Sequence, residues 1–542
     1  MNRSPIIRCL ACLLTILPTL TVRAEPLRQT IDRFVSDGWK RNSVTPAKAA
    51  SDAEFLRRVC LDLNGVIPTY KEALEFLNDA DAKKRQKLID RLINSARYGV
   101  HQSDLWDMIY FGRNPPGYRT RERDAFKLWL QKQLGDNIPV NVWVKKILQA
   151  RGNSVDDGAP MFFVQYRNQP EDAAEAVTQK ILGVQLQCAR CHDHPFDDWS
   201  QQDFYGVAAF FSRLRVVTVG KKGRLMKFAI GEKNLGEVRF TGPVSEQMVG
   251  KKGKTVKPKF PSGLALKEVS LPKGFSEPRN FKANRMPAKP KFSRKDAFAD
   301  WATSANNRYF ARATVNRVWG QLMGKGIVHP IDNLSKNNPP SHPKLLDAMT
   351  KAFVQHKFDL KWLIREITNS TTYQLSATGS GSAAMPLWYE RARFRPLSAE
   401  ELLESWVKAT GYKANGKTNK TPGGRFKFRA ITWDYMRRYF GNPNDGVGNF
   451  KGGMHEHLYL NNGQVHQLIS EKPGSLFATI AKSKDGWEKR VERLFLQVLS
   501  RRPTKPEITK FSTYLSAKAD SRSRLHNAIW TLMTCSEFRF NH

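Results

Sequence analysis

The stretch CARCHDHPFDDWSQQDFYGVAAFF, residues 188–211, joins a C-x-x-C-H motif to a segment with helical periodicity. Asp198 or Ser200 is placed to cap that helix, which we expect over residues 201–211. Upstream, apolar residues recur at i, i+3 and i+4 between residues 170 and 187, which predicts a preceding helix. The motif is therefore expected to close one helix and to be followed by a polar turn and a second helix.

The same helical periodicity extends over most of the chain. It covers residues 26–213, resumes at Ser293 and continues to the terminus, with one glycine-rich interruption at 441–463. Between these regions the short alternating runs VVTV, LMKFAIG and EVRFTG indicate strands. We therefore predict a mainly α fold. It comprises a helical module carrying the C-x-x-C-H motif (25–213), a small β-rich, basic insertion with its linker (214–292) and a helical C-terminal module (293–542).

Composition places the chain among globular proteins, with one unusual property. Apolar residues make up 40% and charged residues 25% of the 542 residues, which excludes wholesale disorder and fibrous repeats. The 88 Lys and Arg residues exceed the 50 Asp and Glu residues and give a formal net charge of +38. A charge of this size predicts attraction to an anionic partner.

The N-terminus predicts export. Arg3 and Arg8 precede an uncharged apolar run over residues 9–22, and small residues at Val22 and Ala24 suit signal-peptidase cleavage. We predict a signal peptide over residues 1–24 and no transmembrane segment after its removal, because this run is short for a membrane span. The alternative, a lipoprotein anchor at Cys12, has little apolar sequence before it. The mature protein is thus expected in the periplasm or at the cell envelope, where anionic polysaccharide is a more suitable partner than nucleic acid.

The C-x-x-C-H motif predicts covalent attachment of c-type haem. At this spacing the thiols of Cys188 and Cys191 both reach the vinyl groups of one haem, while the imidazole of His192 turns onto the iron. Such attachment takes place after export, which the signal peptide provides.

Three other roles remain open for the motif. A disulfide between Cys188 and Cys191 suits an oxidising compartment, although a thiol–disulfide enzyme normally uses a βαβ scaffold. Zinc has suitable ligand types in these cysteines with His192 and His194, although four ligands within seven residues strain a tetrahedral shell. A purely structural role is the third. If haem is present, His194 is expected beside the iron site, with Asp193 or Asp197 orienting an imidazole.

A second axial ligand would decide how the haem is used. Met454, His455 and His457 form the densest group of candidates, in the stretch GGMHEHLYLNNG. We interpret that stretch as a surface loop, with folding over the iron as the alternative; the two histidines also fit a metal pair on one face of a strand. His342 is another candidate, but Ser341 before it is typical of a helix cap, which favours a structural role.

The remaining cysteines and catalytic motifs are less informative. Cys60 and Cys535 lie in apolar patterns and fit either small buried hydrophobes or a pair bonded to each other. The sequence has no G-x-S-x-G elbow and no H-E-x-x-H helix. Whether the protein is an enzyme is therefore left open.

Taken together, these motifs resemble the two-module planctomycete-type cytochrome-like proteins of unknown function. The N-terminal resemblance lies in FLRRVCLDLNGVIPT (55–69), LIDRLINSARYG (88–99) and residues 188–211; the C-terminal resemblance lies in ATVNRVWGQLMGKGIVHPIDN (313–333), PPSHPKLLD (339–347), STTYQLSA (370–377), RPLSAEELLES (395–405) and LSRRPTKPEI (499–508). The resemblance implies that Cys188, Cys191 and His192 attach haem, and it implies no further activity. Unlike larger relatives, this chain has no upstream cytochrome domain with its own C-x-x-C-H motif.

Two functions follow as expectations. The first is an exported c-type haem protein that transfers electrons to an unidentified redox partner at the cell envelope. The second is a non-redox envelope module that binds anionic glycans, with zinc or a disulfide at the motif. The insertion supplies clustered lysines for such binding: Lys221, Lys222, Lys227, Lys251, Lys252, Lys254, Lys257 and Lys259. The alternative is that these lysines only keep a flexible segment solvated.

Overall fold

The computed structural model describes residues 25–112, 120–223, 225–240, 253–277, 289–379, 387–412, 436, 440, 454–517 and 520–542. The signal-peptide prediction and Lys251 and Lys252 lie outside these residues. The structure is 54% helical with 7% strand, which confirms the mainly α fold. Within the described ranges, no helix has the length and apolar character needed to cross a membrane.

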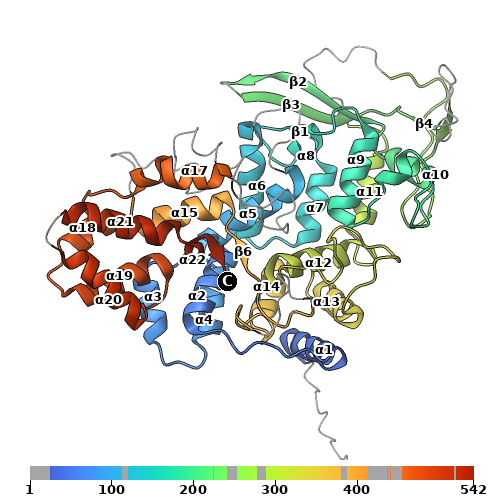
Figure 1. Cartoon of the computed structure of the whole chain (residues 1–542). Coiled ribbons are helices and arrows are strands. Elements are labelled where there is room, and N and C mark those ends of the chain that lie inside the picture. Colours follow the sequence, from blue (N-terminus) through green and yellow to red (C-terminus); the bar gives the residue numbers. More distant parts are fainter. Residues whose placement is uncertain are drawn as a thin grey trace, which may run out of the picture.

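Figure 1 shows the order of the elements. The first helices are α1 (Leu27–Arg41), α2 (Asp52–Asn64), α3 (Tyr70–Asn78), α4 (Lys84–Ile93), α5 (Ala96–Phe111), α6 (Asp124–Gly135), α7 (Val140–Gln149), α8 (Met161–Val164), α9 (Pro170–Val177) and α10 (Gln201–Ala208), with short helical turns η1 (Thr120–Arg123), η2 (Thr178–Leu182) and η3 (Gln187–Arg190). After the insertion come α11 (Arg294–Ala302), α12 (Phe310–Met323), α13 (Pro343–Gln355), α14 (Leu360–Thr368), α15 (Ala399–Thr410), α17 (Met454–Asn462), η5 (Gln464–Leu468), α18 (Leu476–Ala481), α19 (Trp487–Leu499), α20 (Lys505–Ser516), α21 (Ser521–Thr534) and α22 (Ser536–Arg539).

Side-chain caps fix where several helices begin. Thr69 caps α3 and Ser398 caps α15; each hydroxyl accepts the N–H of the glutamate three residues on, whose carboxylate accepts the N–H of the cap residue. Ser200 and Asp203 make the same reciprocal pair at α10, which confirms Ser200 as the predicted cap. These contacts satisfy N–H groups that have no partner inside the helix.

The strands form three small antiparallel sheets. Their bounds are β1 (Gly152–Asn153), β2 (Leu214–Lys222), β3 (Leu225–Glu232), β4 (Val238–Phe240), β5 (Lys254–Val256), β6 (Arg395–Pro396) and β7 (Phe540–Asn541). The hairpin of β2 and β3 pairs Leu214 with Glu232, and β1 adds to β3 by pairing Gly152 with Ile230. A strand from the N-terminal region thus completes the sheet of the insertion.

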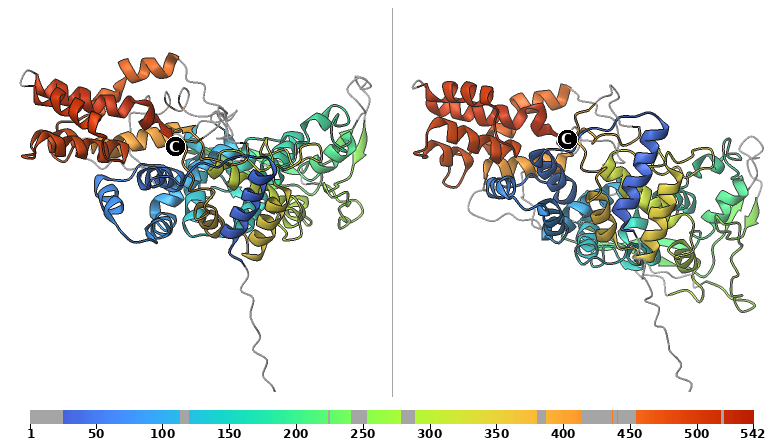
Figure 2. Two further views of the ribbon diagram at one scale, coloured as in Figure 1. Left: turned by 60° about the horizontal axis from the view of Figure 1, so that its bottom comes forward. Right: turned by 90° about the horizontal axis from the view of Figure 1, so that it is seen from below.

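The hydrophobic core consists of two clusters, and the boundary between them does not lie at the insertion (214–292). One cluster unites α1–α10 with the helices just after the insertion, including Phe298 and Trp319. The other contains Trp406 and the helices from α15 onward, joined by Leu61 at the end of α2. Figures 1 and 2 show helices α17–α21 as one end of the molecule and α10 with β4 at the other. The helices α11–α14 therefore pack with the N-terminal region.

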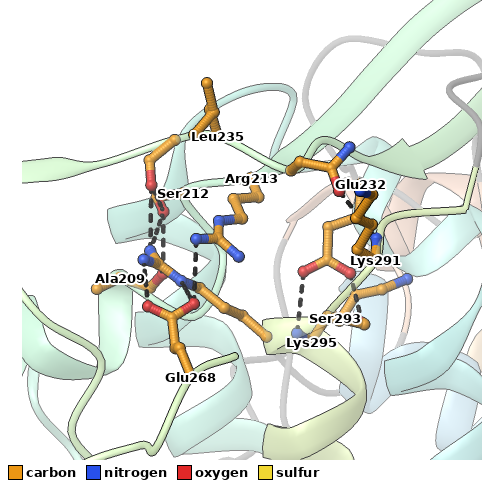
Figure 3. A network of polar contacts seen from close by, with 12 residues as sticks. Ala209, Ser212, Arg213, Glu232, Leu235, Glu268, Lys291, Ser293 and Lys295 are labelled. Atoms are coloured by element: carbon orange, nitrogen blue, oxygen red, sulfur yellow. Dashed lines mark hydrogen bonds and ion pairs between the residues drawn. The ribbon is translucent and has the colours of Figure 1, made fainter. Parts of the chain in front are cut away.

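A buried polar network joins the insertion to α11 (Figure 3). The Arg294 guanidinium donates two hydrogen bonds to Glu268, of 2.8 and 2.7 Å, and further bonds to the carbonyl oxygens of Ala209 and Gly236, of 3.0 and 3.1 Å. Arg213 also contacts Glu268, at 3.0 Å. Because the Arg294 side chain is only 8% exposed, its guanidinium depends on these acceptors for its hydrogen bonds rather than on water.

We predict that Arg294→Met destabilises the protein by about 3 kcal/mol, because it removes one partner of a buried ion pair and leaves the acceptors around it unsatisfied. Chemical denaturation measures this loss. Arg239→Met is the matched control: Arg239 is 51% exposed and contacts Glu237 at 3.6 Å, so its loss should cost less than about 1 kcal/mol. Equal effects of the two substitutions would show that the network does not stabilise the joint.

Candidate functional site

The C-x-x-C-H motif lies on its own short turn, η3. The helix predicted over 170–187 ends five residues early: α9 continues without a break into the π-turn η2, which ends at Leu182. Gly183 follows it with a φ of +69°. A Cβ at Gly183 would lie 2.9 Å from the side chain of Ala313 and 3.1 Å from that of Leu334. A left-handed backbone in this tight position favours glycine, and it releases the chain from the helix before the motif.

The turn presents both cysteines to solvent. The backbone N–H groups of Cys191 and His192 donate to the Cys188 carbonyl over 3.3 and 3.4 Å. Ala189 is fully buried and anchors the turn, while Cys188 and Cys191 are exposed and unbonded. Both thiols are thus accessible to solvent on one short turn.

The ring of His192 has a defined tautomer. Its Nδ1 lies 2.7 Å from the carbonyl oxygen of Asp193. Because a carbonyl only accepts, Nδ1 carries the proton, and the lone pair of Nε2 is left for a metal. His192 is exposed, so its Nε2 is also reachable.

The His194 ring differs from the His192 ring in its hydrogen bonds. Its Nδ1 accepts the backbone N–H groups of Phe196 and Asp197, over 3.3 and 3.0 Å, and lies 3.8 Å from the Asp197 carboxylate. It therefore holds the turn after the motif. Across the described ranges, no three His, Cys, Asp or Glu side chains are grouped to hold a metal ion, so the four-ligand zinc shell is not assembled.

Helices α9 and α10 support one side of the motif. Arg190 pairs with Asp172 over 2.7 Å. The Arg190 carbonyl accepts from Gln201 over 3.1 Å and from the Tyr205 hydroxyl over 3.4 Å. The Gln201 backbone N–H donates to Asp193 over 2.8 Å. These bonds fix the residues on both sides of His192.

The other side is held by residues 332–337, between α12 and α13, here called the 332–337 loop. Asp332 accepts from Gln179 and Gln185 over 2.6 and 3.0 Å, ahead of the motif. The Leu334 N–H donates to the Gly183 carbonyl over 2.7 Å. The approach to Cys188 is therefore fixed by the C-terminal module.

The 332–337 loop also contacts the residues that follow the motif. Ser335 hydrogen-bonds to Asp197. Lys336 pairs with Asp198 over 2.5 Å. Nothing in the local sequence around Cys188 predicts these contacts, because their partners are about 140 residues away.

The predicted second ligands on 454–457 do not reach this site. The predicted loop is wrong here: Met454–Asn462 is the helix α17, a stretch without glycine or proline. Residues 455 and 457 therefore do not share one face of a strand, and the His455 side chain lies outside the described residues. Helices α17 and α10 lie at opposite ends of the molecule in Figures 1 and 2, and Met454 is 76% exposed.

His342 is a buried structural residue. It is itself the N-cap position of α13, so the prediction of Ser341 as cap is wrong; the Ser341 hydroxyl donates to the Ile327 carbonyl instead. The His342 ring lies 5.5 Å from that of Trp388 and 5.4 Å from that of Tyr389. A Cβ at Gly38 in α1 would lie 2.5 Å from its Nε2, so the ring packs between α1, the start of α13 and residues 388–389.

The cysteines outside the motif are not paired with each other. Cys60 and Cys535 are both free thiols. Cys60 is buried in the first core cluster, and burial raises the pKa of its thiol to about 12. The Cys535 thiol donates to the Leu532 carbonyl over 3.2 Å.

Two family models match the chain. PSCyt2, a protein of unknown function (DUF1549), matches residues 30–216, and PSD1, a protein of unknown function (DUF1553), matches residues 294–435. The chain belongs to this two-module family. The C-x-x-C-H motif lies in the PSCyt2 match, whereas the 332–337 loop lies in the PSD1 match. No curated protein and no solved structure matches the chain.

Burial of His342 predicts a pH-dependent stability. Burial, with a smaller effect of Arg41, lowers its pKa from the ordinary 6.5 to about 4. Between these values the unfolded chain binds a proton that the folded chain does not, so the free energy of unfolding should rise from pH 4 to 6.5, by up to about 3 kcal/mol. His342→Leu should flatten this rise in denaturation curves, whereas the exposed His356→Leu should retain it. An unchanged rise in His342→Leu would contradict the assignment.

Proposed function

We propose that this protein is an exported c-type haem protein that transfers electrons at the cell envelope. The proposal rests on the exposure and the hydrogen bonding of the side chains in the C-x-x-C-H motif. Two exposed, unbonded thiols lie on one turn, beside an imidazole whose Nδ1 is engaged and whose Nε2 is available.

The donor set fits covalent haem better than zinc. Cys188 and Cys191 would form the two thioether bonds, and His192 would supply its Nε2 to the iron. His194 uses its Nδ1 within the turn and adds no fourth zinc ligand at this position. When bound, haem would supply a one-electron carrier, and the chain's own residues would hold and orient it.

Both domains would take part in this orientation. Asp193 fixes the tautomer of His192, while Arg190, Asp172 and Gln201 hold the turn from the PSCyt2 side. The 332–337 loop holds the flanking residues from the PSD1 side. Since both cysteines are exposed, the attached group would lie at the surface, where a redox partner can reach it.

Variants of the motif test the proposal in a host competent for c-type maturation. The wild-type protein should retain a Soret band after denaturation, because thioether-linked haem cannot dissociate. Cys188→Ala and Cys191→Ala should each weaken retention and together abolish it, whereas His192→Ala should alter the spectrum while attachment persists. Cys535→Ala is the control with unchanged haem. A folded, exported and colourless wild-type protein would overturn the proposal.

A second candidate function is binding to anionic glycans through the insertion. Lys222 and Lys227 pair with Asp156 at the exposed end of the β2–β3 hairpin. Lys221, Lys254 and Lys257 are exposed as well. In this function zinc or a disulfide would occupy the motif, and metal analysis showing about one zinc per chain would favour it over haem.

Salt-dependent binding tests this second function. Exchanging Lys221, Lys254 and Lys257 together for glutamine should lower the salt concentration needed for elution from a sulfated matrix, because screening acts within about 8 Å at physiological ionic strength. Point variants are preferable to deleting the insertion, since Glu268 belongs to the network at α11. The triple substitution of Lys484, Lys489 and Lys510 to glutamine, three exposed lysines of the C-terminal module, is the charge-matched control. Identical elution of both triple variants would exclude the insertion as the binding element.

A further inference from the structure

A second candidate site lies away from the C-x-x-C-H motif, in a cavity of about 80 Å³ between the two domains. The PSCyt2 domain contributes α5 and the end of α2, and the PSD1 domain contributes α12, α14 and the start of α15. Several lining side chains, including Leu105 and Gln321, are half-buried, so the cavity opens to solvent. Its volume exceeds the space of one water molecule several times.

Most of the cavity wall is apolar. Leu105, Met108 and Ile109 line it from α5, and Val318 and Leu322 line it from α12. Such a wall suits the hydrocarbon part of a small molecule.

The polar end of the cavity contains two buried polar atoms without hydrogen-bond partners. One is an amide oxygen; the other, Nε2 of His101, is an acceptor in the tautomer that carries the proton on Nδ1. The side chain of His101 is 5% exposed, and its Nε2 makes no hydrogen bond. Gln102, 2% exposed as a residue, likewise leaves its Oε1 without a partner. Unsatisfied buried polar atoms cost stability, so a ligand that donates to them would gain affinity.

The Gly65 backbone fixes the position of the His101 ring. Gly65 has a φ of +63°, and a Cβ there would lie 2.3 Å from Nδ1 of His101. The ring therefore packs against the glycine backbone. Its Nε2 lies 3.9 Å from Oε1 of Glu401, too far for a direct hydrogen bond.

The electrostatics of this end favour a cation. Two carboxylates share one guanidinium: Arg395 contacts Glu401 over 2.7 Å and Asp62 over 2.9 Å. The charged residues that line the cavity are four carboxylates (Asp62, Asp104, Glu400 and Glu401) and two guanidiniums (Arg393 and Arg395). Lys127 pairs with Asp104, so one negative charge is in excess. His101 does not supply the missing cation, because burial lowers the pKa of its imidazole.

We propose that this cavity binds a small organic cation, a primary ammonium group on an apolar body. The three N–H donors of the ammonium would serve His101 Nε2, Gln102 Oε1 and the Glu401 carboxylate, and the hydrocarbon part would lie along Leu105 and Val318. A bare metal ion fits less well, since the described residues hold no group of three metal-ligating side chains. The proposal is independent of haem at the motif.

Calorimetry with three probes of equal shape tests the charge requirement. Benzylammonium should bind to the full-length protein, benzyl alcohol should bind at least tenfold more weakly, and benzoate should not bind measurably. Equal binding of benzylammonium and benzyl alcohol would overturn the cation assignment. No binding of benzylammonium would overturn the proposal as a whole.

Variants locate the bound probe. His101→Leu and Gln102→Leu should each weaken benzylammonium binding about tenfold, because each removes one acceptor. His457→Leu, an exposed histidine on α17, is the control with wild-type affinity, as is Cys188→Ala. If His101→Leu does not fold, Leu105→Trp provides a second test. The tryptophan fills the cavity and leaves its polar end unchanged, so this variant should not bind the probe. Wild-type affinity in a folded His101→Leu or Leu105→Trp variant would place the probe elsewhere.

Discussion

The guanidinium of Arg395, held between Asp62 and Glu401, is the buried ion pair that fixes how the two domains are oriented against each other. It joins α2 of the PSCyt2 domain to β6 and α15 of the PSD1 domain. Tyr373, in the segment after α14, and Asn541, in the C-terminal strand β7, also donate hydrogen bonds to Asp62, over 2.8 and 2.7 Å. Both segments therefore belong to the same cluster. Arg395 with its hydrogen bonds lowers the pKa of Glu401 to about 2 despite burial, so the carboxylate is charged throughout the physiological range. Buried ion clusters of this kind fix one relative arrangement, because any other leaves charges unpaired.

That fixed arrangement explains why a motif in one domain is completed by the other. The 332–337 loop reaches Gly183, Asp197 and Asp198 only if α12 stays packed on the N-terminal region. The shared hydrophobic core of α1–α14 supplies that packing. The pairing of PSCyt2 with PSD1 in one chain thus has a physical basis: the second domain is part of the scaffold of the first.

Local patterns predicted the helical content and the Ser200 cap, because helical periodicity and capping depend on residues a few positions apart. Spacing alone also singled out Cys188, Cys191 and His192. The end of the preceding helix was missed, although Gly183 is a local signal for it, because its left-handed backbone ends η2. The helix α17 was missed because nearby glycines and asparagines suggested a loop. The cavity beside His101 has no local signature at all; it arises from helices of both domains.

We propose that Cys188, Cys191 and His192 hold one covalent haem in a scaffold built by both domains. The most direct measurement is the intact mass of the mature protein, exported from a host competent for c-type maturation and denatured before analysis. The expected mass is that of the processed chain plus one haem, with the modified peptide containing both cysteines. A mass equal to the unmodified chain, from protein that is folded and exported, would contradict it.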